Sequence, residues 1–264
     1  MLSRLRALAV VMEITFDQLL WSKRTILIEL LALLPPAIAA TWRITIAVGI
    51  ARPLISESAL FSSLMVTAYL QFLMLLVSLF YGTALVADEV DNKTLTYLTT
   101  RPVPKPLLLA GKLAACFLVC IFMIYHSVLL TYFVLYSMKG MDGLMAGSTI
   151  LLKDLLVMLL GIIAYGCIFC FLGAVTKRPL LIGLIFCAGW ESLITYLPGL
   201  TRKFTVMHFL QSMFPHISGQ DMALLIPNQN ATLGESLTMI AFYSALFLGL
   251  AIYAFTHRQY VFEQ

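Results

Sequence analysis

The sequence predicts an all-α polytopic membrane protein with six transmembrane helices. Hydrophobic residues make up 61% of the 264 residues and charged residues only 11%, whereas soluble domains usually carry about 25% charged residues. Several segments reach the length of about 20 mostly apolar residues that a spanning helix needs. Backbone amides in hydrocarbon must bond internally, so helices are the natural spanning element. We interpret residues 1–264 as one transmembrane domain.

The first 24 residues predict an amphipathic helix lying in the membrane surface. Apolar residues recur there at helical spacing: Leu2, Leu5, Ala9, Met12, Phe16 and Leu19. Arg6, Glu13 and Asp17 lie off this stripe, and Trp21 with the basic pair Lys23-Arg24 suits a headgroup boundary. A cytosolic helix packed on a partner is the alternative.

Six apolar segments follow, and we predict spans at 25–51, 59–87, 107–137, 154–175, 180–197 and 237–256. The first of them is broken by Pro35-Pro36. An even number of spans places both termini on the same side of the membrane.

Basic residues indicate which side that is, because cytoplasmic loops carry an excess of Lys and Arg. Eleven lie on the predicted side of the termini: Arg4, Arg6, Lys23, Arg24, Lys93, Arg101, Lys105, Lys112, Lys177, Arg178 and Arg258. Six lie on the other: Arg43, Arg52, Lys139, Lys153, Arg202 and Lys203. We therefore expect both termini to be cytoplasmic in a multi-pass protein of the prokaryotic plasma (inner) membrane. The net charge of +4 reflects this topology rather than a nucleic-acid surface.

Residues 198–236 would then be external. This segment is too polar to span, yet it carries closely spaced apolar residues: Phe204, Met207, Phe209, Leu210, Met213 and Phe214. We expect short external helices between spans five and six that dip into the outer leaflet.

The connector between spans two and three reads DEVDNKTLTYLTTRPVPKP, residues 88–106, and follows 29 residues without a charge. Its acidic residues favour a helix N-terminus. Thr94, Leu95, Tyr97 and Leu98 would form a short helix with an apolar face, which Arg101-Pro102-Val103-Pro104 ends. The pattern predicts a rigid cytoplasmic coupling helix suited to receive force from a partner. An ordinary connecting loop is the alternative.

Enzymatic interpretations fit poorly. Asp88, Glu89 and Asp91 suggest a metal site, but on a helix Glu89 points about 100° away from the other two, and no second acidic cluster faces them. Gly111-Lys112 resembles the end of a phosphate-binding loop, yet Pro106 and Leu113 stand where a glycine and a hydroxyl residue belong. We expect no metal, cofactor or nucleotide site in this chain. An intramembrane enzyme and a non-transporting scaffold of the same fold remain alternatives.

The connector resembles permeases of the type-2 ABC exporter class. These commonly show an acid, then Gly-Thr-Leu, a Leu, a Pro-Val pair, a basic residue and a Gly-Lys that opens the third span. The matching residues here are Glu89, Thr94-Leu95, Leu98, Pro102-Val103, Lys105 and Gly111-Lys112. Lys93 departs from the family's usual glycine. The motif covers about 25 residues, and the predicted layout extends the resemblance over most of the chain.

The resemblance implies a permease that dimerises with a second copy or a paralogue, binds two cytosolic ABC ATPase subunits and exports a substrate. ATP and Mg would be bound by those partners. The implied coupling residues are Glu89, Thr94, Tyr97, Leu98, Arg101, Pro102 and Lys105. We expect the permease dimer to pack through spans one and five, with Pro35 and Pro36 near the seam and lipids around it.

Polar residues at membrane depth are candidates for function by default. Glu191, beside Trp190, would line the translocation path, order an outer gate, or pair with Arg202 or Lys203. Glu29 would snorkel or pair with Lys112. His126 is a packing residue or a ligand.

Cysteine labelling from each side of the membrane tests the topology. A single cysteine at position 97 should react with an impermeant maleimide only after the cytoplasmic face is exposed. Labelling of position 97 in intact cells would contradict the predicted orientation.

Overall fold

The computed structural model describes residues 2–49, 55–91, 104–137, 140–194, 203–214 and 231–257. These residues are almost entirely helical, and no strand occurs among them. Five helical segments within these ranges are long and apolar enough to cross a membrane: Lys23–Ala47, Glu57–Ala87, Lys105–Tyr136, Gly140–Val175 and Leu233–His257. The all-helical polytopic membrane fold is therefore confirmed.

The helices are, in chain order: α1 (Leu2–Leu20), α2 (Lys23–Ala32), α3 (Leu34–Ala47), α4 (Glu57–Ser63), η1 (Leu64–Leu73), α5 (Met74–Asp91), α7 (Lys105–Tyr136), α8 (Gly140–Val175), α9 (Pro179–Ile185), η3 (Phe186–Leu193), α11 (Val206–Met213) and α12 (Leu233–His257). Both η segments are wound as π-helices.

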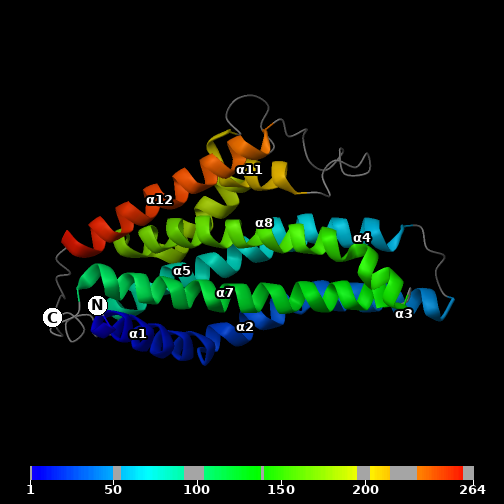
Figure 1. Cartoon of the computed structure of the whole chain (residues 1–264), viewed down its shortest axis with the longest axis horizontal. Coiled ribbons are helices and arrows are strands. Elements are labelled where there is room, and N and C mark those ends of the chain that lie inside the picture. Colours follow the sequence, from blue (N-terminus) through cyan, green and yellow to red (C-terminus); the bar gives the residue numbers. More distant parts are fainter. Residues whose placement is uncertain are drawn as a thin grey trace.

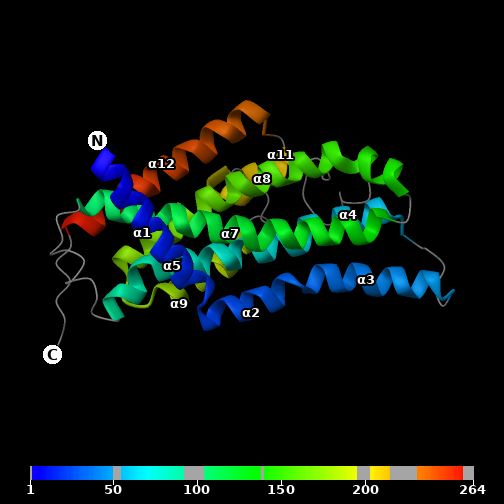
Figure 2. The same cartoon turned by 60° about the horizontal axis from the view of Figure 1, so that its bottom comes forward.

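The long helices run side by side along the long axis of the molecule (Figure 1). The central helix, α5, packs against α7, α8 and α9, and α12 packs mainly on α8. The chain α1–α2–α3 follows α7 on its other side, as Figures 1 and 2 both show. The start of α1, the end of α5, the start of α7 and the end of α12 share one end of the bundle, which we call the terminal end.

Two predicted spans differ from the observed helices. The fourth begins at Gly140 rather than at residue 154, because Lys153 and Asp154 lie within a continuous helix instead of ending it. Asp154 is fully buried there. The fifth predicted span, 180–197, corresponds to α9 and η3 (179–193), which is shorter than the five candidate spans. Six spans are therefore not established.

The N-terminal helix forms as predicted, but it uses a slightly different face. Thr15 and Leu19 are buried, while Ala9, expected on the apolar stripe, is exposed. The contact with α7 sets this face. A Cβ at Gly111 would lie 3.1 Å from Val11 Cγ1 and 3.3 Å from the Leu8 carbonyl oxygen. Glycine at position 111 therefore lets α1 approach the backbone of α7.

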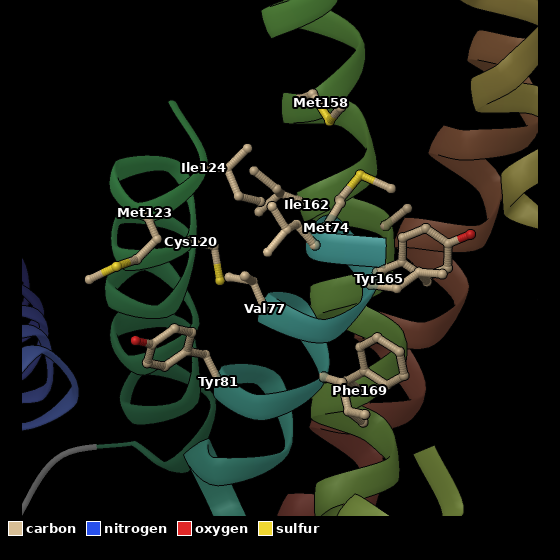
Figure 3. Packing of buried hydrophobic residues seen from close by; sticks show 14 of the residues in the cluster. Met74, Val77, Tyr81, Cys120, Met123, Ile124, Met158, Ile162, Tyr165 and Phe169 are labelled. Atoms are coloured by element: carbon tan, nitrogen blue, oxygen red, sulfur yellow. The ribbon is translucent and has the colours of Figure 1, made fainter. Parts of the chain in front are cut away.

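The core lies between α5, α7 and α8 and is built from large apolar side chains and cysteines (Figure 3). Lipid tails are as apolar as these side chains, so close packing must hold the helices together in a membrane. Gly173 of α8 shows how close the approach is, because a Cβ there would lie 2.8 Å from the Thr83 carbonyl oxygen of α5.

The double proline separates α2 from α3 and leaves backbone acceptors without donors. Pro36 has no N–H to donate to the Ala32 carbonyl. Ser127 of α7 fills this gap by donating its hydroxyl to Ala32 O. The Tyr69 hydroxyl of η1 in turn lies 2.9 Å from Ser127 Oγ and 2.6 Å from Thr131 Oγ1. Spans one, two and three therefore meet in one buried hydroxyl network.

Pro35 and Pro36 are buried inside this chain, and their place near a seam between two permeases stays a prediction. The break in the first span packs against the chain's own third span, because the Ala32 carbonyl finds its donor there.

Replacing Ser127 by alanine should destabilise the bundle. The change leaves the Ala32 carbonyl without its donor in a dry site, at a cost of about 1–2 kcal/mol in the free energy of unfolding. Reversible unfolding in mixed micelles would measure it. Ser244→Ala is the matched control, because Ser244 only bonds back to Ile240 O within α12 at 2.7 Å. Equal losses in the two variants would contradict the role of Ser127.

Candidate functional site

The predicted coupling segment, residues 88–106, joins the end of α5 to the start of α7 at the terminal end of the bundle. Its central residues, including Thr94, Tyr97, Leu98, Arg101 and Pro102, lie outside the residues that the structure describes. Glu89 belongs to the last turns of α5. The helix on each side of the segment is thus defined, and the conformation of the segment itself stays a prediction.

Two lysines in the first turns of α7 contact neighbouring helices. Lys105 Nζ donates to the Thr256 carbonyl in the last turn of α12 at 3.4 Å. Lys112 is buried, and its Nζ donates to the Leu85 carbonyl of α5 at 3.5 Å. A cation near a helix C-terminus is favoured by the helix dipole. The residues that flank the coupling segment therefore tie α7 to both α5 and α12.

A second link joins α5 to the elbow between α1 and α2. The Tyr81 hydroxyl of α5 donates to Thr25 Oγ1 at 2.8 Å, and Thr25 donates onward to the Leu19 carbonyl at 2.5 Å. Ser22 Oγ also lies 2.9 Å from Thr25 Oγ1. Sequence analysis missed this cluster, although two hydroxyl residues at the boundary between an amphipathic helix and an apolar run are a recognisable signal.

Glu29 and His126 form a close side-chain pair between α2 and α7. His126 Nε2 lies 2.7 Å from Glu29 Oε1, and the two side chains are 28% and 32% exposed respectively. The expected pairing of Glu29 with Lys112 is therefore wrong, since Lys112 reaches the Leu85 carbonyl instead. No local sequence signal connects His126 with Glu29, because 97 positions separate them.

Glu191 is fully buried and holds the N-terminus of α11. Its Oε2 accepts from the Tyr165 hydroxyl of α8 at 2.9 Å and from the Met207 amide at 3.2 Å, and its Oε1 accepts from the Val206 amide at 3.4 Å. The N-cap residue Thr205 accepts from the His208 amide at 3.4 Å. A carboxylate at a helix N-terminus is favoured by the dipole and by unpaired amides. Glu191 thus fixes α11 against η3 and α8.

The helix that Glu191 holds, α11, is one of the short helices predicted between spans five and six. All residues of α11 from Val206 to Gln211 are buried, so this short helix is packed into the bundle. Ser212 Oγ lies 2.7 Å from Ser236 Oγ and joins the end of α11 to the start of α12. Trp190 is about half exposed.

Replacing Glu191 by glutamine should loosen α11. The neutral amide keeps the shape but removes charge-assisted bonds, at a cost of about 1–3 kcal/mol when they are buried. Faster hydrogen exchange of the amides in 206–213 would report it. Glu235→Gln is the matched control, because the exposed Glu235 also accepts a helix-terminal amide, that of Thr232, at 2.9 Å. Unchanged exchange in Glu191→Gln would contradict the anchoring role.

Comparison with known protein families identifies the family of this chain. The sequence model of one protein family, described as ABC-2 family transporter protein, matches residues 20–188, well over half of the chain. The match begins at the elbow before the first span and includes the whole coupling segment. A comparison with curated protein sequences finds no match. The chain therefore belongs to the ABC-2 transporter family and is a transmembrane transporter subunit.

Proposed function

We propose that this chain is the permease subunit of an ATP-driven exporter, which forms the translocation path while separate ABC ATPase subunits supply the force. The observation that carries the proposal is the position of residues 88–106. They join the two central helices α5 and α7 at the terminal end, where the excess of basic residues predicts the cytoplasm. Family membership supports the same assignment.

The contacts around this segment would spread its movement through the bundle. α5 packs against α7, α8 and α9. A displacement of the end of α5 would therefore move all three of these helices. Tyr81 would carry the movement to the α1–α2 elbow, and Lys105 would carry it to α12. Rigid helices with fixed contacts at their ends suit a machine that alternates between two packed states.

We propose that two permease chains pack together, through spans one and five. Exposed apolar side chains of the fifth segment support this arrangement: Leu181, Leu184 and Ile185. In the first span, α3 and its C-cap offer Ile38, Ile44 and Val48. Both surfaces need apolar cover, which either a second chain or lipid provides. Two ABC ATPase subunits would bind the dimer, one at each coupling segment, and would hold ATP and Mg.

The Glu191 cluster would order an outer gate in this transporter. α11 and the start of α12 lie near the middle of the long axis of the molecule, away from the terminal end (Figure 1). Because Glu191 is buried against helix amides, it would position α11 rather than contact the substrate. A scaffold that does not transport is the second candidate, and transport by the purified complex separates the two.

The double variant Tyr97→Ala and Leu98→Ala tests the coupling role. Interface energy concentrates in a few large residues, so losing both anchors should reduce retention of the co-expressed ATPase by about tenfold or more. Membrane insertion should be unchanged. The retained ATPase and its activity in proteoliposomes are the measurements. Thr100→Ala is the control within the same segment, because a small residue beyond the predicted apolar face should contribute little.

Full retention of the ATPase with coupled hydrolysis in the double variant would mean that the segment is a passive connector. Replacing Glu89 or Arg101 should instead alter the association rate and its salt dependence, because charges at the rim of an interface act mainly on encounter.

A further inference from the structure

The Glu29–His126 pair stands where two exposed apolar stripes meet. On α7 the exposed residues above and below His126 are Leu118, Phe122, Leu129, Leu130 and Phe133. On α2 and its C-cap the exposed residues around Glu29 are Ile26, Leu30 and Leu33. A carboxylate and an imidazole are thus the polar groups in the middle of a surface that is otherwise built for hydrocarbon.

The hydrogen bonds of the pair leave one carboxylate oxygen, Glu29 Oε2, without a donor among the described residues. His126 uses both ring nitrogens, Nε2 toward Glu29 Oε1 at 2.7 Å and Nδ1 toward the Phe122 carbonyl at 3.0 Å. Glu29 Oε2 has no partner among the residues that the structure describes. Because about a third of Glu29 is exposed, this oxygen is accessible from outside the bundle.

The depth of Glu29 makes the unfilled oxygen costly. Arg24 precedes it by five residues, so at 1.5 Å per residue Glu29 lies roughly 8 Å further along the helix axis. Trp21 is almost fully exposed and, with Lys23 and Arg24, is placed to meet the headgroups. An acceptor below that level finds little water, and an unsatisfied polar group there is unfavourable.

We propose that the Glu29–His126 pair binds the ammonium group of a cationic amphiphile that arrives sideways from the membrane. Glu29 Oε2 accepts a hydrogen bond from the ammonium group, and the ring of Phe122, stacked on His126 with centroids 5.6 Å apart, offers its face to the cation. The exposed stripes of α2 and α7 hold the apolar tail. This proposal rests on the transport function proposed above and names the class of molecule that the permease accepts.

A second copy of the chain fits this site less well. A two-fold contact through this face would bring two Glu29–His126 pairs together. Each pair carries an unfilled carboxylate oxygen, and neither imidazole has a spare N–H, since both nitrogens of His126 already face acceptors. Two copies would therefore place acceptor against acceptor, whereas an ammonium group brings the donors that the site lacks.

Photolabelling of the purified chain in lipid nanodiscs, without ATPase, tests the proposal. The probe is a primary alkylammonium with a diazirine in its alkyl chain, compared with the alcohol and the carboxylate of the same length. The ammonium probe should label peptides from 26–33 and 118–133 most strongly. Glu29→Gln should reduce that labelling by about tenfold, because a charged acceptor becomes neutral. Glu13→Gln, which changes an exposed carboxylate of α1, should leave it unchanged.

A second variant separates loss of the site from loss of the fold. His126→Gln keeps a donor for Oε1 and leaves the Glu29 charge in place, so it should retain most of the labelling. Equal labelling by the ammonium and alcohol probes, or no effect of Glu29→Gln, would overturn the proposal. So would a Glu29→Gln variant that loses its dimer in nanodiscs, because the face would then belong to a second copy. Labelling needs no ATPase, so failure of the coupling variants would not affect it.

Discussion

Proline in a membrane helix creates a backbone acceptor that lipid cannot satisfy, and the arrangement of the first three spans follows from that constraint. The Ala32 carbonyl, opposite Pro36, takes its hydrogen bond from Ser127. Ser127 and Thr131 share the hydroxyl of Tyr69, so the break in span one is fixed to spans two and three. Buried networks of this kind specify one packing, because any shift leaves several groups unsatisfied at once.

The first span is also fixed at both of its ends by polar contacts. At the terminal end, Thr25 accepts from Tyr81 of α5. At the opposite end, Arg43 Nη1 donates to the Val134 carbonyl at 2.8 Å and to Ser137 Oγ at 2.6 Å, at the C-terminus of α7. A cation suits that position because the helix dipole is negative there. Span one is thus held at three levels, while much of its apolar surface stays uncovered and available to lipid or a partner.

Two carboxylates at membrane depth illustrate different uses of the same group. Glu191 is enclosed, and its oxygens accept bonds from a tyrosine and two helix amides. These bonds hold the start of α11 against η3 and α8. Glu29 is partly exposed, and its pairing with His126 uses one oxygen. Ionisable groups in membranes face either a packed interior or a path for other molecules. Glu191 occupies the first setting, and we propose the second for Glu29.

The sequence by itself determined the class of the fold, the positions of the apolar helices and the family. The long uncharged run 59–87 predicts a spanning helix, and the motif at 88–112 indicates the family. Both signals are local in the sequence, so they do not depend on tertiary contacts. Only the tertiary structure decided the pairings: Glu29 with His126, Ser127 with Ala32, and Glu191 with the amides of α11. Hydropathy acts on each segment separately and sets where a helix crosses the membrane. A hydrogen bond between spans depends on the rotation and depth of two helices, which the packing of the whole bundle fixes. The burial of Pro35 and Pro36 against the chain's own third span is one result of that packing.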